Sequence, residues 1–197
     1  MPVDFRTTIG ADLWRYYGRD DRGAFWKAFR EMPGFRYSYF LRKCQAARQR
    51  PRWLRIASTL PYRWLLDHYR YRYGFEIPIE SEIGPGLYIG HFGHLTVHPE
   101  SRLGCNVNLS PGVVIGQTNR GRKQGVPVIG NCVWIGTNAV VVGGITVGDH
   151  VMIAPGAYVN FDVPDNAVVV GNPGQIVSYG GTANYVENIV EHIVDHI

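Results

Sequence analysis

Residues 129–163 read IGNCVWIGTNAVVVGGITVGDHVMIAPGAYVNFDV and carry a clear internal repeat. Every sixth position is a β-branched aliphatic residue: Ile129, Ile135, Val141, Val147, Ile153 and Val159. A second apolar series follows four residues behind the first: Val133, Ala139, Ile145, Val151, Ala157 and Val163. A period of six fits neither an α-helix nor an alternating strand. It predicts short strands joined by turns, three to a triangular coil, with the aliphatic side chains stacked inward.

The same period runs upstream, with two interruptions. It joins Ile77, Ile83, Ile89 and Leu95, and then, offset by two residues, Val97, Leu103, Leu109 and Ile115. The offset falls within residues 90–97, and a longer break separates Ile115 from Ile129. Because residues 117–125 in that break are polar and rich in glycine, we expect them to form a protruding loop.

A sharp change of composition near residue 75 divides the chain. Residues 1–75 hold 16 of the 20 Lys and Arg residues and only 5 of the 24 glycines. We expect an α-helical region over 1–75, the coil over 76–177 and a C-terminal helix over 178–197. Within the first region we expect a helix capped by Asp12, a break at Pro33-Gly34, and further helices over about 36–50 and 52–73. The C-terminal helix is expected from an apolar stripe: Val186, Ile189, Val190, Ile193, Val194 and Ile197.

Composition also limits the class of protein. Three cysteines without CxxC spacing argue against a disulfide framework or a zinc ribbon and favour the cytoplasm. We expect no signal peptide and no membrane span. The basic, aromatic N-terminal region could lie against the inner face of an anionic membrane. Packing on the coil or on partner subunits is the favoured interpretation, and no motif indicates nucleic acid.

Two segments carry a resemblance to a known family. The hexads in residues 133–139, VWIGTNA, and the ending in residues 170–174, VGNPG, resemble those of the hexapeptide-repeat acyltransferases. Over residues 35–177 the chain is similar to the serine acetyltransferase-like branch, which includes capsular and exopolysaccharide O-acetyltransferases. The resemblance implies a mainly β protein with a left-handed parallel β-helix, acetyl-CoA as co-substrate without a metal, and a homotrimer whose active sites lie between subunits.

The chain departs from that branch at three positions. Gly90 precedes His91 where the branch has an Asp-His pair, and Val126 precedes Pro127 where it has a second histidine. Glu76 stands where it usually has Asp. These differences favour a sugar hydroxyl of capsule, exopolysaccharide or O-antigen biosynthesis as the acetyl acceptor. Serine O-acetyltransferase of cysteine biosynthesis is the alternative.

His91 is the expected catalytic base. Acetyl transfer to an alcohol needs a base for the hydroxyl proton, and an imidazole suits this task near neutral pH. His91 lies at an interruption of the repeat, between Gly90 and Gly93, and matches the catalytic histidine that the resemblance implies. His94 and His98 are nearby rivals. Glu76 is expected to orient His91 or to hold the acceptor.

The arm of coenzyme A is expected to run along the coil. Backbone amides near Gly116, Gly136 and Ala154 would contact it, and Thr137 and Pro155 border the path by resemblance. The loop residues Arg120, Arg122 and Lys123 could meet its phosphates, although a solvated loop explains them equally well.

Two other classes remain open. His91, His94 and His98 would suit a zinc-dependent, carbonic-anhydrase-like β-helix, although three ligands within eight residues converge poorly across a coil. A non-catalytic membrane or assembly scaffold would instead use the basic N-terminal region.

Overall fold

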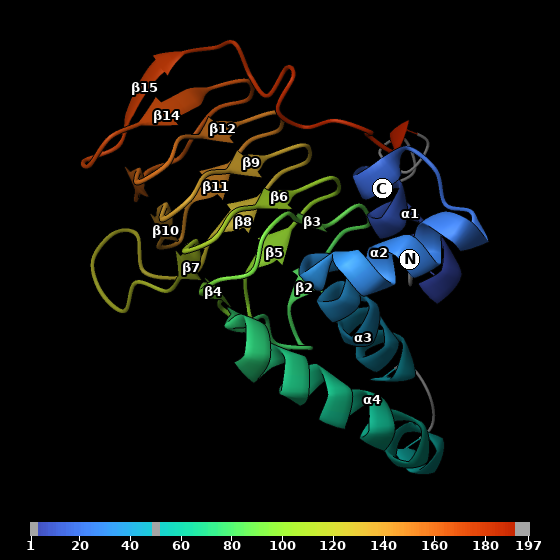
Figure 1. Ribbon diagram of the computed structural model, residues 1–197. Helices are drawn as coiled ribbons and strands as arrows, with labels where there is room; N and C mark the ends of the chain where they lie inside the picture. The colour runs from blue at the N-terminus through green and yellow to red at the C-terminus, as the bar shows by residue number, and fades with distance from the viewer. Residues whose placement is uncertain (1–3, 49–51, 192–197) are drawn as a thin grey trace.

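The computed structural model describes residues 4–48 and 52–191, and within them a helical region precedes a stack of short strands (Figure 1). The helices are α1 (Phe5–Tyr17), α2 (Arg22–Glu31), α3 (Pro33–Arg48) and α4 (Arg52–Tyr73). The strands are β1 (Phe75–Glu76), β2 (Glu82–Ile83), β3 (Tyr88–Ile89), β4 (Leu95–Val97), β5 (Arg102–Leu103), β6 (Asn108–Leu109), β7 (Val114–Gly116), β8 (Val128–Ile129), β9 (Trp134–Ile135), β10 (Val140–Val142), β11 (Thr146–Val147), β12 (Met152–Ile153), β13 (Tyr158–Val159), β14 (Val168–Val170) and β15 (Gln175–Ser178).

The strands form a three-sided parallel β-helix, as the period of six predicts. Sheet I has the order β1-β4-β7-β10-β13, sheet II the order β11-β8-β5-β2, and sheet III the order β15-β14-β12-β9-β6-β3. Successive strands along the chain pass from sheet I to sheet II to sheet III, so each turn of the chain is one coil. The pairs are parallel except β14 with β15, which is antiparallel.

The lead positions of the repeat form the core. In sheet I, Val97, Ile115, Val141 and Val159 are register partners from one coil to the next. All four are buried, and so are the lead residues of the other two sheets except Ile83 in the first coil, which is partly buried. Burying each such side chain contributes about 1.5–3 kcal/mol, so the stacked columns are the main apolar source of stability.

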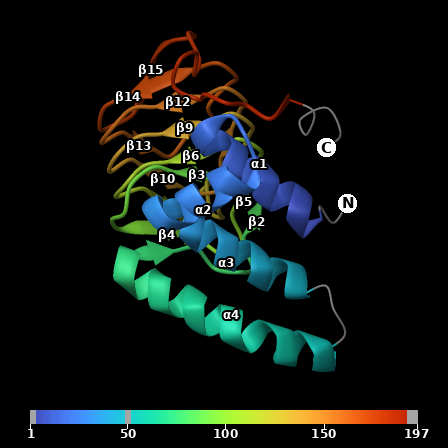
Figure 2. The ribbon, with the colours of Figure 1, turned by 45° about the vertical axis from the view of Figure 1, so that its right-hand side comes forward.

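The helical region covers the start of the coil. Figure 2 shows α1, α2 and α3 beside the first coils, and α1 and α3 both contact β3. The expected cap at Asp12 is wrong: α1 begins at Phe5, and the Asp4 side chain accepts a hydrogen bond from the Arg6 N–H at 3.0 Å. Asp12 lies inside this helix and is fully buried because Arg42 pairs with it.

The junction between helix and coil is a left-handed glycine. Gly74 has φ +75° and donates its N–H to the Arg70 carbonyl at 2.9 Å, which ends α4. The next residue, Phe75, begins β1 and is buried. A helical region therefore leads directly into the coil, as expected.

The C-terminal segment differs from the expectation. Residues 179–190 form turns and extended chain instead of a helix, and residues 192–197, which include half of the predicted stripe, lie outside the described residues. Asn184 and Asn188 have positive φ, which an α-helix does not accommodate. The segment is held by distant partners instead: the Val190 N–H donates to Asn106 Oδ1 at 3.2 Å and Arg15 Nε donates to the Glu187 carbonyl at 2.9 Å.

None of the helices in the described residues is both long enough and apolar enough to cross a membrane.

Candidate functional site

The predicted residues of the coil gather at one corner, between sheet III and sheet I. We call residues 90–94, 110–112, 136–138 and 154–156 the III–I corner. Hydrogen bonds stack its layers: the Gly112 N–H donates to the His94 carbonyl, the Asn138 N–H to the Pro111 carbonyl at 2.9 Å, and the Gly156 N–H to the Thr137 carbonyl at 2.8 Å. The corner therefore brings five of the predicted residues into one column: His91, Gly136, Thr137, Ala154 and Pro155.

His91 lies on a bulge in this column. Five residues, 90–94, join Ile89 to Leu95, whereas three residues make the same connection in the next coil, between Leu109 and Val113. The two extra residues are the physical basis of the offset in the repeat. The His91 side chain is exposed, and among the described residues it makes no hydrogen bond or ion pair. It is therefore free to meet a ligand.

The bulge is anchored to the end of α4. The Gly93 N–H donates to the Tyr73 carbonyl, and the Leu95 N–H donates to the Gly74 carbonyl, both at 3.0 Å. Gly93 has φ +145°, which glycine adopts without strain. The helical region thus fixes the backbone that carries His91.

The layers at Gly136 and Gly156 differ in whether a larger side chain would fit there. A Cβ atom at Gly136 would lie 2.6 Å from the Pro155 nitrogen, so this layer accepts only glycine. A Cβ at Gly156 would meet nothing within 4 Å. The corner is therefore tightly packed between its layers and open on its outer side, where an elongated ligand could lie.

Two of the expected contacts to coenzyme A are not available. The Gly136 N–H donates to the Ile153 carbonyl and the Ala154 N–H to the Val169 carbonyl, both at 2.8 Å. Because these amides hold the coils together, a ligand at the corner would have to contact other atoms of these residues.

Glu76 has a partner other than His91. It lies on β1, is exposed, and forms an ion pair with Arg70 of α4. Its register partner in sheet I is Thr96, whose hydroxyl lies 3.2 Å from His94 Nε2. A polar row therefore runs from Arg70 through Glu76 and Thr96 to His94, along the edge of sheet I next to the bulge.

The three histidines do not converge. His94 contacts Thr96, and His98 Nδ1 accepts a hydrogen bond from the Glu100 N–H at 3.2 Å. In the part of the chain that the structure describes, no three His, Cys, Asp or Glu side chains come close enough to hold a metal ion. The zinc alternative gains no support from this arrangement.

The loop that follows β7 begins where the strands of sheet I end, whereas the III–I corner lies where these strands begin. Thr118 and Gly125 exchange two backbone hydrogen bonds of 3.0 Å, which close the loop at its base. Gly116, at the end of β7, pairs with Val142. The loop leaves between sheet I and sheet II, so within one chain it does not reach the III–I corner.

The three basic residues of this loop differ in whether an acidic side chain pairs with them. Lys123 forms an ion pair with Asp162, while Arg120 and Arg122 are exposed. The hydrogen bond from Lys123, followed by one from the Thr146 N–H, lowers the pKa of the Asp162 carboxyl. Arg120 and Arg122 are thus the loop cations left to meet an anionic ligand.

Sequence reasoning missed three partners at these places: Arg70, Thr96 and Asp162. Thr96 could have been found, because β1 and β4 carry the same period and their outward positions must align. The position of Arg70 depends on where α4 ends, and that of Asp162 depends on a turn far along the chain. The period of six residues predicts neither position.

A cavity of about 830 Å³ lies elsewhere, against sheet II and α3. Arg42, Ile83 and Leu103 are among the residues that line it, and it includes none of the predicted site residues.

Comparison with known proteins agrees with the fold. The bacterial transferase hexapeptide family (six repeats) matches residues 127–160. The chain is similar to a serine acetyltransferase of Bacillus subtilis, with 36% identity over 112 residues, which are 57% of this chain and 52% of that protein. The chain thus spans about half the length of the curated relatives it matches.

Two solved structures extend the likeness to most of the chain. One is the serine acetyltransferase of Neisseria gonorrhoeae in complex with serine, with a TM-score of 0.70 and 28% identity over 88% of this chain and 69% of that one. The other is the serine acetyltransferase of Brucella abortus in complex with coenzyme A, with a TM-score of 0.70 and 26% identity over 87% of this chain and 66% of that one. The expected left-handed parallel β-helix with a helical N-terminal region is thereby confirmed, and the chain is similar to hexapeptide-repeat proteins of the serine acetyltransferase-like branch.

Proposed function

We propose that this protein is an acetyl-CoA-dependent O-acetyltransferase with His91 as its general base. The observation that carries the proposal is the III–I corner, where an exposed imidazole without a hydrogen-bond partner among the described residues lies in the same column as small residues with an open outer side. The solved relative with coenzyme A has the same fold, which supports acetyl-CoA as the donor.

The proposed reaction needs few groups. The His91 imidazole accepts the proton of the acceptor hydroxyl as the oxygen attacks the thioester carbonyl, which contributes about 10²–10⁴ in rate. The tetrahedral intermediate then collapses, its bond to sulfur breaks, and His91 returns the proton to the departing thiolate. Its exposed position on an anchored bulge gives the ring access to both reactants while its backbone stays fixed.

L-Serine is the acceptor that the comparisons favour. The relatives reported above are named serine acetyltransferases, and one was solved with serine. These relatives support serine, the alternative acceptor in the sequence analysis, better than they support a sugar hydroxyl.

A sugar hydroxyl is the second candidate, because specific residues favour it. Val126, before Pro127, is apolar where the family resemblance implies a histidine, and Gly90 replaces an acidic residue. Glu76, where that branch has Asp, is held by Arg70. A pocket changed at three positions would suit an acceptor other than free serine.

One assay separates the two candidates. Release of coenzyme A from acetyl-CoA is followed with L-serine and with a panel of sugar acceptors under the same conditions. Saturable turnover with serine supports the first candidate, and turnover only with a sugar supports the second. Release that stays at the rate of hydrolysis with every acceptor would contradict the proposed function.

We also propose a homotrimer, because the loop cations need a second chain to reach the site. The outer side of sheet I carries partly exposed apolar residues in register: Val114, Val140 and Tyr158. Packing this side against a neighbour would bring Arg120 and Arg122 of one subunit toward the III–I corner of the next. Light scattering should give three times the 22.2 kDa chain mass, and a monomeric active enzyme would contradict the arrangement.

A further inference from the structure

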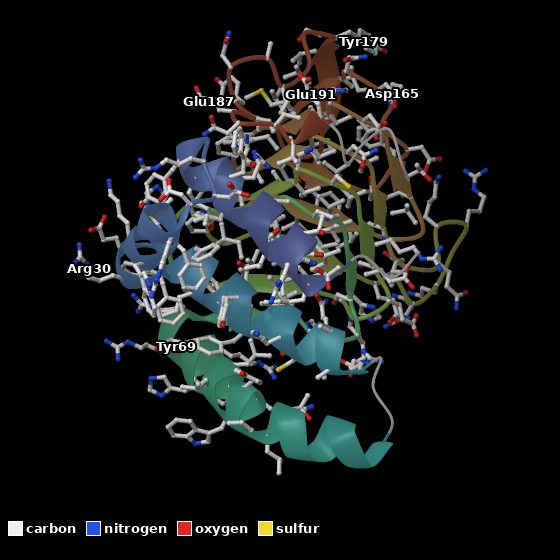
Figure 3. The ribbon with its side chains drawn as sticks, turned by 90° about the vertical axis from the view of Figure 1, so that its right-hand side faces the viewer. Arg30, Tyr69, Asp165, Tyr179, Glu187 and Glu191 are labelled. Carbon is white, nitrogen blue, oxygen red and sulfur yellow. The ribbon has the colours of Figure 1, made fainter. Side chains whose placement is uncertain are left out.

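Helix α4 carries two apolar sides, and only one of them is packed. Leu66 and Tyr73 are buried, and Tyr69 stacks on Phe40 of α3 with ring centroids 5.5 Å apart. Figure 3 shows Tyr69 on the side of α4 that faces α3. This side accounts for the attachment of α4 to the rest of the molecule.

The opposite side of α4 is large, apolar and uncovered. Leu60, Trp64 and Tyr71 are 63%, 69% and 81% exposed. At 100° per residue these three positions fall within about 40° of one another around the helix. Figures 1 and 2 show α4 at the end of the molecule opposite β14 and β15, with no other element beyond it. We call Leu60, Trp64 and Tyr71 the α4 face.

The charge around the α4 face is positive. Helix α4 contains five arginines and one aspartate. The aspartate, Asp67, lies on the face and is neutralised by Arg63 at 4.0 Å. Arg70 is paired with Glu76, and Arg72 is exposed. A helix with Trp, Tyr and Leu on one side and arginines beside them has the composition of a helix that lies in a membrane interface.

The charge distinguishes a lipid surface from a second copy of the chain. Two α4 faces packed on one another would bring no opposite charge to Arg72, because Arg63 already pairs with Asp67 and Arg70 with Glu76. An anionic lipid surface offers the complementary charge and an apolar layer that tryptophan and leucine can enter. We infer that the α4 face binds the protein to the surface of an anionic phospholipid membrane. This inference goes beyond acetyl transfer and does not depend on it.

Flotation of the full-length protein with vesicles tests the inference. The vesicles are made of phosphatidylcholine alone or of phosphatidylcholine mixed with phosphatidylglycerol. We expect binding to the mixed vesicles that is lost at high salt. Trp64→Ala should weaken it at least about tenfold, and Arg72→Gln about fivefold.

Helix α2 supplies matched controls. Trp26 is 58% exposed and Arg22 is also exposed, so Trp26→Ala and Arg22→Gln remove the same groups from another surface. These two variants should bind the mixed vesicles like the wild type. Equal unfolding midpoints for all four variants show that the fold is kept.

Three outcomes would overturn the inference. The first is equal binding to both kinds of vesicle or to neither, and the second is equal loss in Trp26→Ala and Trp64→Ala. The third is a particle mass in lipid-free solution that falls in Trp64→Ala, which would make the α4 face an interface between copies. Acetyl transfer to a soluble acceptor should be unchanged in all four variants. A negative result in the flotation experiment would therefore overturn membrane binding and leave the proposed function intact.

Discussion

Asp12 and Arg42 form a buried ion pair that joins the first and third helices to the start of the coil. The two side chains are 0% and 4% exposed, and Arg42 Nε lies 3.0 Å from Asp12 Oδ2. Asp12 Oδ1 also accepts hydrogen bonds from the Gly86 and Leu87 N–H groups at 2.9 and 2.8 Å. Arg42 donates in turn to the carbonyls of Ile83 and Gly84, both at 2.7 Å. One pair therefore satisfies backbone groups where the helices meet the first coil.

Breaking this pair should destabilise the protein strongly. Asp12→Ala leaves the Arg42 charge buried without its partner and frees two backbone donors, so we expect a loss of about 3–5 kcal/mol in the free energy of unfolding. Urea denaturation measures it. The control is Glu82→Gln, which removes an exposed pair with Arg102 at 3.0 Å and should cost about 1 kcal/mol or less. Equal losses in the two variants would contradict the role of burial.

Replacing the proposed base should abolish most of the activity without affecting the fold. In His91→Ala, kcat with the best acceptor should fall by about 10²–10⁴ because no group remains to accept the hydroxyl proton. His94→Ala is the matched variant, since His94 lies three residues away and contacts Thr96. It should lose much less. Wild-type turnover by His91→Ala would remove this residue from the mechanism.

Two glycines of the predicted donor path should respond differently to one added methyl group. In Gly136→Ala the new Cβ would lie 2.6 Å from the Pro155 nitrogen, and because backbone cannot move aside easily we expect a loss of about 1–3 kcal/mol. In Gly116→Ala the nearest atom is a side-chain methyl of Val142 at 3.3 Å. We expect a change of about 1 kcal/mol or less there. Thermal unfolding of both variants provides the comparison.

The loop between β7 and β8 should depend on Asp162 in a pH-dependent way. The hydrogen bond from Lys123 lowers the pKa of Asp162, so the bond is fully formed at pH values above the ordinary 3.8 and is lost as pH falls through the lowered value. At neutral pH, Asp162→Asn should therefore speed amide hydrogen exchange in residues 117–125 by about two- to fivefold. The difference from wild type should disappear in acid. A difference that persists there would contradict the assignment.

The three cysteines should be inert in the folded protein. All of them are buried free thiols, and burial raises the pKa of Cys44 and of Cys105 to about 11. Because the thiolate is the reactive form, a raised pKa lowers reactivity at every pH below it. An aromatic disulfide reagent at pH 8 should label no thiol in the native protein and three after unfolding. Rapid labelling of one native thiol would place that cysteine at the surface.

The coil was predictable because its repeat is a direct consequence of packing. Each lead residue, such as Val141, must point inward in every coil, so the period appears in the sequence without reference to the rest of the molecule. The bulge at His91 was predictable for the same reason, since two added residues shift the period by two. Because the bulge lies between the strand of sheet III and the strand of sheet I in its coil, it must lie at the III–I corner.

The contacts between segments were not predictable in this way. Asp12 resembles a helix cap in sequence, and only the distant Arg42 makes it a buried partner. Glu76 could be placed next to the bulge, but its pairing with Arg70 depends on where α4 ends. The apolar spacing of residues 186–197 suits a helix, yet Asn184 and Asn188 adopt left-handed backbone, and Asn188 donates to the Arg15 carbonyl of α1 instead.

The antiparallel pairing of β15 with β14 ends sheet III with a strand that runs against the direction of the coil. A parallel coil ends in strands whose N–H and C=O groups are free to template another strand, so an uncapped stack could recruit further chains end to end. By reversing direction, Gln175–Ser178 occupies the last row of sheet III with a strand that cannot start a new turn. At the other end α1 and α3 lie against β3, so neither end of sheet III offers a bare parallel strand to another coil.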